Sequence, residues 1–139
     1  VNVRNPRAIR PWQHVLEPLS GYLELAEQLW DHGDEFAEGW NFGPYDEDAK
    51  AVSWIVEQLT DRWGGTAAWR LDEAEHPHEA HYLKLDTSKA RARLNWQPRW
   101  RLEEALGRIV DWYRAYVAGE DMQAFSLGQI KAYQSSEPI

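Results

Sequence analysis

The chain has 139 residues, of which 43% are hydrophobic, and a formal net charge of −8. This length is typical of one domain with a buried core, and the acidic balance argues against non-specific nucleic-acid binding, which needs a basic face. The absence of cysteine excludes disulfides and thiolate metal sites and fits a reducing compartment such as the cytoplasm. No apolar run approaches the roughly 20 residues that span a bilayer, so we expect no membrane partner.

The first residue is Val1 rather than an initiator methionine, and we interpret residues 1–139 as a single unit cut from a longer chain. Residues 1–15 are expected to form a loop with short extended pieces, because prolines keep the residues before them out of the α region. A first helix is predicted over residues 17–30. Apolar residues recur along it at three- and four-residue steps and form one stripe: Leu16, Leu19, Leu23, Ala26 and Trp30.

Short strands and helices alternate over the rest of the chain. Strands are predicted over residues 36–42, 67–71 and 82–85, and helices over 48–63, 89–94 and 102–117, with a short final helix over 127–133. Three main helices with so few strands indicate an α/β or α+β-like fragment in which most of a doubly wound sheet is missing. No Gly-x-Gly-x-x-Gly turn follows a strand, so we expect no dinucleotide cofactor to bind these residues.

Three arginines precede the first helix. Arg4, Arg7 and Arg10 lie within residues 1–16, where there is no carboxylate, although the whole chain is acidic. Local charge that opposes the global balance is typical of an anion site, and a guanidinium donates two parallel hydrogen bonds to phosphate oxygens. Arg10 is the leading candidate. The alternatives are a surface arginine and a salt bridge to Glu17.

A second cluster contains three histidines and a carboxylate within six residues: His76, His78, Glu79 and His81. Such residue types can bind zinc, but Pro77 disfavours a helix and no helical His-x-x-x-His pair is present, so we expect no metal site. A ligand-binding loop whose histidines donate to phosphate or ribose is favoured over a metal-dependent hydrolase site. A solvated polar loop is the plain alternative.

These features together resemble the C-terminal part of the extended short-chain dehydrogenase/reductases, and within that family the nucleotide-sugar dehydratases. The similarity covers nearly the whole chain. It is carried by RNPRAIRPWQHVLEPLSGYL (residues 4–23), GWNFGP (39–44), HPHEAHYLKLD (76–86) and SKARARLNWQPRW (88–100). The first run is the most specific, whereas the last is common to many nucleotide-sugar epimerases and dehydratases.

The resemblance implies that residues 1–139 are a substrate-binding lobe that follows an NAD-binding Rossmann domain. The arginine matching Arg10 holds the diphosphate of the nucleotide sugar, and the loop from His76 to Glu79 reaches the diphosphate and ribose. His76, His78, Glu79 and Tyr82 are therefore substrate-binding candidates beside Arg10. This chain departs from the family where many relatives have Arg-Pro-Gly in place of His76-Pro77-His78.

The implied reaction of the intact enzyme is the NAD-dependent conversion of CDP-glucose to CDP-4-keto-6-deoxyglucose, in deoxysugar and lipopolysaccharide O-antigen biosynthesis. The family's Tyr-x-x-x-Lys pair is absent from this sequence. We therefore expect no catalytic residue in this chain, no activity of it alone, and a homo-oligomeric intact enzyme in the cytoplasm. The alternatives are part of another nucleotide-sugar epimerase or dehydratase, and a non-catalytic binding domain. A lobe without its Rossmann domain is also expected to expose a large apolar patch and to self-associate.

Overall fold

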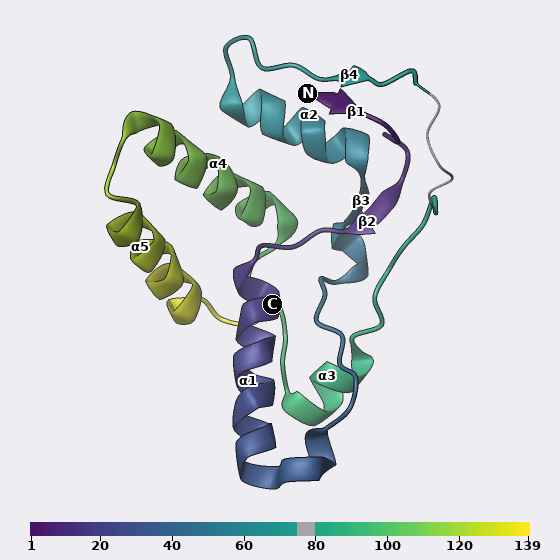
Figure 1. The fold of residues 1–139 in the computed structure, drawn as a ribbon, viewed down its shortest axis with the longest axis vertical. Helices are drawn as coiled ribbons and strands as arrows, with labels where there is room; N and C mark the ends of the chain where they lie inside the picture. Colours follow the sequence, from purple (N-terminus) through teal and green to yellow (C-terminus); the bar gives the residue numbers. More distant parts are fainter. Residues whose placement is uncertain (75–79) are drawn as a thin grey trace.

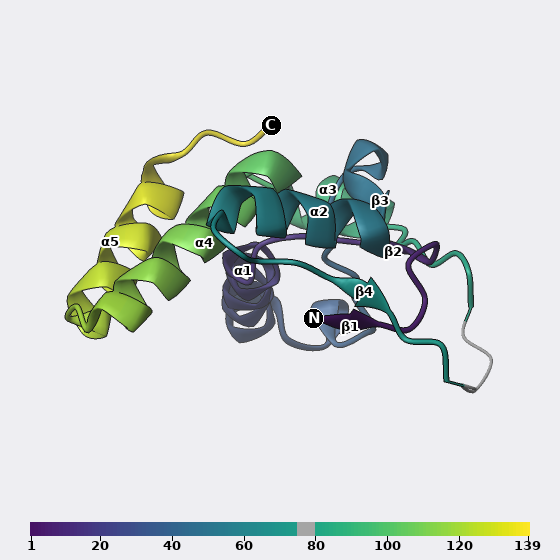
Figure 2. The same cartoon turned by 90° about the horizontal axis from the view of Figure 1, so that it is seen from above.

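The computed structural model describes residues 1–74 and 80–139. Its longer helices are α1 (Leu16–His32), α2 (Val52–Trp63), α4 (Leu102–Ala118) and α5 (Met122–Ser135), and α3 (Ser88–Leu94) is shorter. In Figure 1, α1 runs along the longest axis, α2, α4 and α5 lie around its upper end, and α3 lies beside its lower half. Seen from above in Figure 2, α4 lies between α5 and α2.

The strands are short and form two pairs. β1 (Asn2–Val3) pairs in parallel with β4 (Arg70–Leu71), and β2 (Ile9–Pro11) pairs antiparallel with β3 (Ala49–Ala51). The predicted mixture of helices and short strands is therefore confirmed. None of the helices in the described residues is both long and apolar enough to cross a membrane.

Several predicted boundaries are wrong. The helix predicted from residue 48 begins at Val52, because Asp46–Asp48 forms a 3-10 turn and the next three residues pair with β2. The final helix is twice the predicted length and makes a fourth main helix. It begins at Met122, because the side chain of Asp121 accepts hydrogen bonds from the free backbone N–H groups of Gln123 and Ala124 in the first turn.

Two predicted strands are absent. Phe36 ends a 3-10 turn (Gly33–Phe36), and within the described residues no backbone–backbone hydrogen bond joins residues 39–44 to another segment. A strand requires such a neighbour. The predicted strand at residues 82–85 is reduced to a single bridge between Tyr82 and Ile9.

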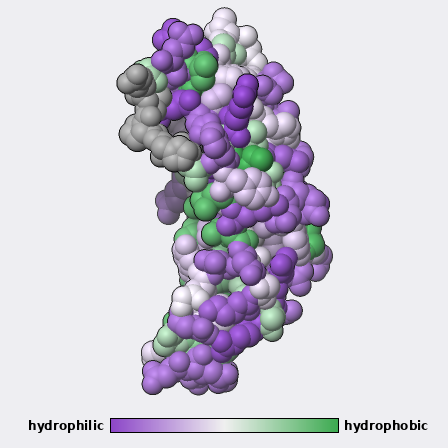
Figure 3. All heavy atoms as spheres, turned by 90° about the vertical axis from the view of Figure 1, so that its right-hand side faces the viewer, coloured by the Kyte–Doolittle hydropathy of each residue, from purple (hydrophilic) through white to green (hydrophobic). Residues whose placement is uncertain are grey.

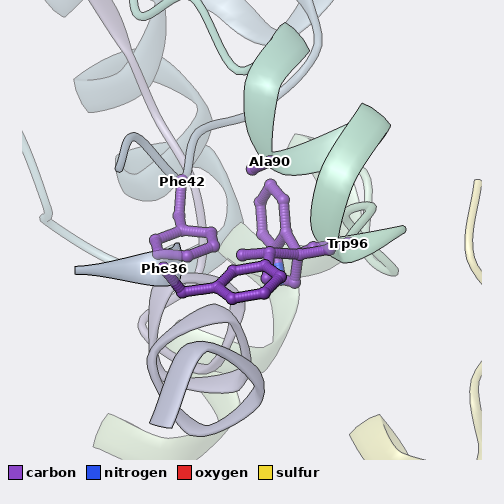
Figure 4. Packing of buried hydrophobic residues seen from close by; sticks show 5 residues of the cluster. Phe36, Phe42, Ala90 and Trp96 are labelled. Carbon is purple, nitrogen blue, oxygen red and sulfur yellow. The ribbon is translucent and has the colours of Figure 1, made fainter. Parts of the chain in front are cut away.

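The apolar core has two clusters. Phe36, Phe42, Ala90, Leu94 and Trp96 pack together between α1 and α3, as Figure 4 shows at close range. Ile55, Leu102 and Leu106 form the second cluster between α2 and α4, and Trp12 packs against it. The first cluster joins the segment after α1 to α3. The second joins Trp12, the residue that follows β2, to α2 and α4.

The apolar stripe predicted for α1 is not its buried side. Its apolar stripe faces solvent, with Leu23 70% and Trp30 90% exposed, whereas Glu17 and Gly21 are buried. Gly21 explains the orientation, because a Cβ atom there would lie 2.2 Å from Cδ1 of Phe42. Only glycine lets the helix approach the Phe42 ring this closely.

Glu17 is the second reason for this orientation. Its side chain is completely buried, and its carboxylate accepts hydrogen bonds from the backbone N–H of Trp100 (2.8 Å), the backbone N–H of Arg99 (3.1 Å) and the hydroxyl of Tyr133 (2.7 Å). Ser20, one turn later, accepts a bond from the indole N–H of Trp96. This polar network ties α1 to the segment before α4 and to α5.

Candidate functional site

Arg10 lies in the centre of β2, directly opposite Lys50 of β3. Residues directly opposite in an antiparallel pair project from the same face of the ribbon. Two cations therefore share one face, and like charges in this position are unfavourable unless an anion lies near them. Arg10 is half-buried, and its guanidinium donates to the carbonyl oxygen of Ile9 (2.8 Å).

Lys50 is a residue that the sequence analysis missed. Its ammonium lies 5.6 Å from the ring centroid of Trp54, and its carbonyl oxygen accepts a hydrogen bond from the indole N–H of Trp12. The missing signal was the strand at residues 49–51, because the register that brings Lys50 opposite Arg10 exists only once that strand is recognised.

The segment that contains Tyr82 lies along the other edge of β2. The backbone N–H of Ile9 donates to the carbonyl oxygen of His81 (2.8 Å), and the N–H of Leu83 donates to the carbonyl oxygen of Ile9 (3.2 Å). Two segments more than 70 residues apart in the chain, one with Arg10 and one with Tyr82, are thus joined by backbone hydrogen bonds. The structure brings these two predicted site residues onto neighbouring backbone segments.

The other predicted site residues, His76, His78 and Glu79, lie outside the described residues. The described residues resume at Ala80, and the carbonyl oxygen of the next residue, His81, accepts a hydrogen bond from the N–H of Ile9 in β2. Among residues 1–74 and 80–139, no group of three or more histidine or acidic side chains is arranged to hold a metal ion.

A polar cavity of about 560 Å³ adjoins the Tyr82 segment. Lys84 lines it and forms an ion pair with Asp46 (2.9 Å), and its ammonium lies 5.4 Å from the ring centroid of Tyr82. Hydrogen bonds to Tyr82 and Asp46 raise the pKa of Lys84, which keeps it charged. Arg91, also in the lining, lies over the ring of Tyr45. A cavity lined by both charges and an aromatic ring suits a polar ligand.

The surroundings of His14 indicate a structural role. It is buried, its Nδ1 accepts a hydrogen bond from the backbone N–H of Leu16 (3.2 Å), and its ring meets that of Trp100 edge to face. Burial and, secondarily, the charge of Arg108 lower its pKa, so the ring is neutral near pH 7. A neutral ring packed in this way holds the turn before α1.

Glu17, the alternative partner for Arg10, forms its hydrogen bonds with other residues. The hydrogen-bond donors to its carboxylate are Arg99, Trp100 and Tyr133. Burial raises the pKa of Glu17, and these hydrogen bonds oppose that rise.

The other two predicted arginines, Arg4 and Arg7, are exposed. The face of the molecule drawn in Figure 3 is polar over most of its area, and its apolar residues lie in small groups.

Comparison with known proteins identifies relatives of this chain. No family model matches the chain. CDP-glucose 4,6-dehydratase of Salmonella typhimurium is 58% identical over 136 residues, which are 98% of this chain and 38% of that protein. UDP-glucuronic acid decarboxylase 1 of Arabidopsis thaliana is 30% identical over 112 residues, or 81% of this chain and 24% of that protein.

The first of these similarities includes both segments joined at β2, since only three residues of the chain lie outside the match. The chain spans about two-fifths of the length of that dehydratase. The resemblance to nucleotide-sugar dehydratases expected from the sequence is thereby confirmed, and this chain is a relative of CDP-glucose 4,6-dehydratase over nearly all of its own length.

Proposed function

We propose that this chain is the C-terminal, substrate-binding part of an NAD-dependent CDP-glucose 4,6-dehydratase. The observation that carries the proposal is the 58% identity to that enzyme over 98% of the chain. The lower identity to a UDP-glucuronic acid decarboxylase, 30%, makes a dehydratase the better candidate. The intact enzyme then converts CDP-glucose to CDP-4-keto-6-deoxyglucose with loss of one water, for deoxysugar and O-antigen biosynthesis.

In this proposal the chain binds the nucleotide end of the substrate. Arg10 holds the diphosphate, with support from its position on a strand whose facing residue is also a cation. Tyr82, on the adjoining segment, lines the same site, and His76, His78 and Glu79 reach the diphosphate and ribose. The hydrogen bond between His81, two residues after Glu79, and the strand that carries Arg10 supports this assignment.

When bound to the longer protein, NAD would supply hydride transfer in this chemistry, and we assign the residues that would hold it to positions outside these 139. The absence of a Tyr-x-x-x-Lys pair and of a glycine-rich phosphate turn supports that assignment. The same reasoning makes the chain inactive on its own. The absence of cysteine supports a cytoplasmic location, and we expect the intact enzyme to be a homo-oligomer.

The test is turnover by the full-length protein with NAD and, in separate reactions, CDP-glucose, UDP-glucose and UDP-glucuronic acid. Mass spectrometry of the sugar nucleotide is the readout. We expect CDP-glucose alone to lose the mass of one water. Decarboxylation of UDP-glucuronic acid without dehydration of CDP-glucose would contradict the proposal and favour the second relative's activity.

A further inference from the structure

Trp12, two residues after Arg10, makes a contact that the proposed function leaves unexplained. Its indole N–H donates a hydrogen bond to the carbonyl oxygen of Lys50 (2.9 Å), which belongs to the strand paired with β2. Its ring is partly buried and packs against the apolar cluster between α2 and α4. One side chain therefore joins the segment of Arg10 to β3 by a hydrogen bond and to two helices by apolar contact.

The pair of strands that carries Arg10 is short. β2 and β3 have three residues each, and an isolated two-stranded pair is at best marginally stable in water. A slip of one residue would turn every side chain of a strand to its opposite face. Arg10 would then leave the face that it shares with Lys50. The register of β2 and β3 therefore decides on which face the Arg10 side chain lies.

The segment before Arg10 is held by its main chain. The carbonyl oxygens of Pro6 and Ala8 accept hydrogen bonds from the N–H groups of Ser53 (2.9 Å) and Val52 (3.0 Å), the first two residues of α2. The N-terminus of a helix leaves such N–H groups without a partner in the helix, so these bonds satisfy both segments. The chain is thus fixed by main-chain bonds before Arg10 and by an indole bond after it.

We propose that Trp12 is a positioning residue for Arg10, because its bond to the Lys50 carbonyl oxygen holds the register that presents the Arg10 guanidinium to the diphosphate. This inference rests on the proposed function, since it takes Arg10 to be the residue that binds the diphosphate. An indole suits the task, because its N–H only donates and its ring buries a large apolar area. A guanidinium needs this support, because its paired hydrogen bonds to phosphate depend on a fixed geometry.

A purely structural role for Trp12 is the alternative, and Trp40 provides the control. Trp40 is also partly buried, and its indole N–H donates to the carbonyl oxygen of Phe36 at nearly the same distance (3.0 Å). This bond lies within the segment after α1 and involves neither β2 nor β3. Trp12→Phe and Trp40→Phe each keep an aromatic ring and lose a hydrogen bond of the same kind, so we expect similar decreases in Tm.

The test is calorimetric titration of the full-length protein with CDP and, separately, with cytidine. The loss of one hydrogen bond that positions Arg10 predicts that Trp12→Phe weakens CDP binding by roughly 3–10-fold. Cytidine affinity should be unchanged in this variant, and both affinities should be unchanged in Trp40→Phe. Equal CDP affinities of the two variants, or a parallel loss of cytidine affinity in Trp12→Phe, would overturn the inference.

A double variant separates positioning from direct contact between Trp12 and the ligand. If Trp12 acts through Arg10, Trp12→Phe should cause no further loss of CDP affinity once Arg10→Gln is present, and additive losses would contradict the inference. Unchanged CDP binding in Trp12→Phe, with weaker binding in Arg10→Gln, would refute the positioning role alone. Unchanged CDP binding in Arg10→Gln would refute the proposed role of Arg10, and the inference with it.

Discussion

Replacing Glu17 with alanine is expected to destabilise the protein by about 3–5 kcal/mol. The variant removes the acceptor of two buried backbone N–H groups, those of Arg99 and Trp100, and of the Tyr133 hydroxyl. Each buried donor left without an acceptor costs about 1–3 kcal/mol. The Tyr133 hydroxyl can turn toward Ser20, which lies 3.0 Å away, so the cost falls mainly on the two backbone groups and on the lost packing.

Glu17→Gln is the matched control. Its amide oxygen accepts from the backbone N–H groups, and its NH₂ group donates to the Tyr133 oxygen, so we expect a loss of only about 1 kcal/mol. The loss of charge is partly offset because the buried carboxylate no longer has to be desolvated. Urea denaturation followed by circular dichroism measures both variants. If Glu17→Ala were as stable as Glu17→Gln, the network would contribute nothing and the reasoning would be refuted.

Three further predictions follow from the packing and the ionisation of α1 and its neighbours. Burial raises the pKa of Glu17, so the folded state binds this proton more tightly than the unfolded state, and stability from this group falls as pH rises from about 4.5. Urea midpoints of Glu17→Gln should lack that decline, and parallel curves for both proteins would contradict it. Gly21→Ala should cost about 2–3 kcal/mol by thermal unfolding, because its Cβ would overlap the Phe42 ring, and an unchanged Tm would disprove the close approach. Asn95→Ala should cost about 1 kcal/mol in the same assay, since residue 95 has φ 52°, and a neutral result would show that the left-handed turn is not required.

The long helices were predictable because their apolar periodicity and end signals are local. The predicted helix at residues 102–117 agrees with α4 to one residue, and Gly119 ends it in the left-handed conformation. The orientation of α1 was not predictable from periodicity. The buried side is set by Glu17 and Gly21, whose partners Trp100, Tyr133 and Phe42 lie far along the chain.

The prediction of a strand at residues 36–42 was wrong for a related reason. Alternating Trp40 and Phe42 give a strand pattern, but a strand forms only where another segment supplies hydrogen bonds. In the described residues no such segment pairs with residues 39–43. The pattern therefore indicates an intrinsic strand preference that the described residues do not satisfy.

For the candidate site, the sequence pointed to the arginine as a candidate but not to the residues around it. The charge contrast and the family resemblance both led to Arg10, and Tyr82 followed from the resemblance alone. Lys50 required the register of β2 and β3, which depends on where α2 begins. Cross-strand neighbours of this kind are set by long-range pairing and cannot be inferred from spacing along the chain.

The central claim is that Arg10 binds the diphosphate of a cytidine nucleotide, and calorimetric titration of the full-length protein tests it most directly. The binding of CDP and of cytidine is compared in the wild type and in Arg10→Gln. Lys131→Gln, at an exposed position in α5, is the control variant. Loss of a charge-assisted hydrogen bond of about 1.5–3 kcal/mol predicts that Arg10→Gln weakens CDP binding by roughly 10–100-fold. Cytidine binding and the Lys131 variant should be unchanged. Equal CDP affinity in the wild type and Arg10→Gln would contradict the claim.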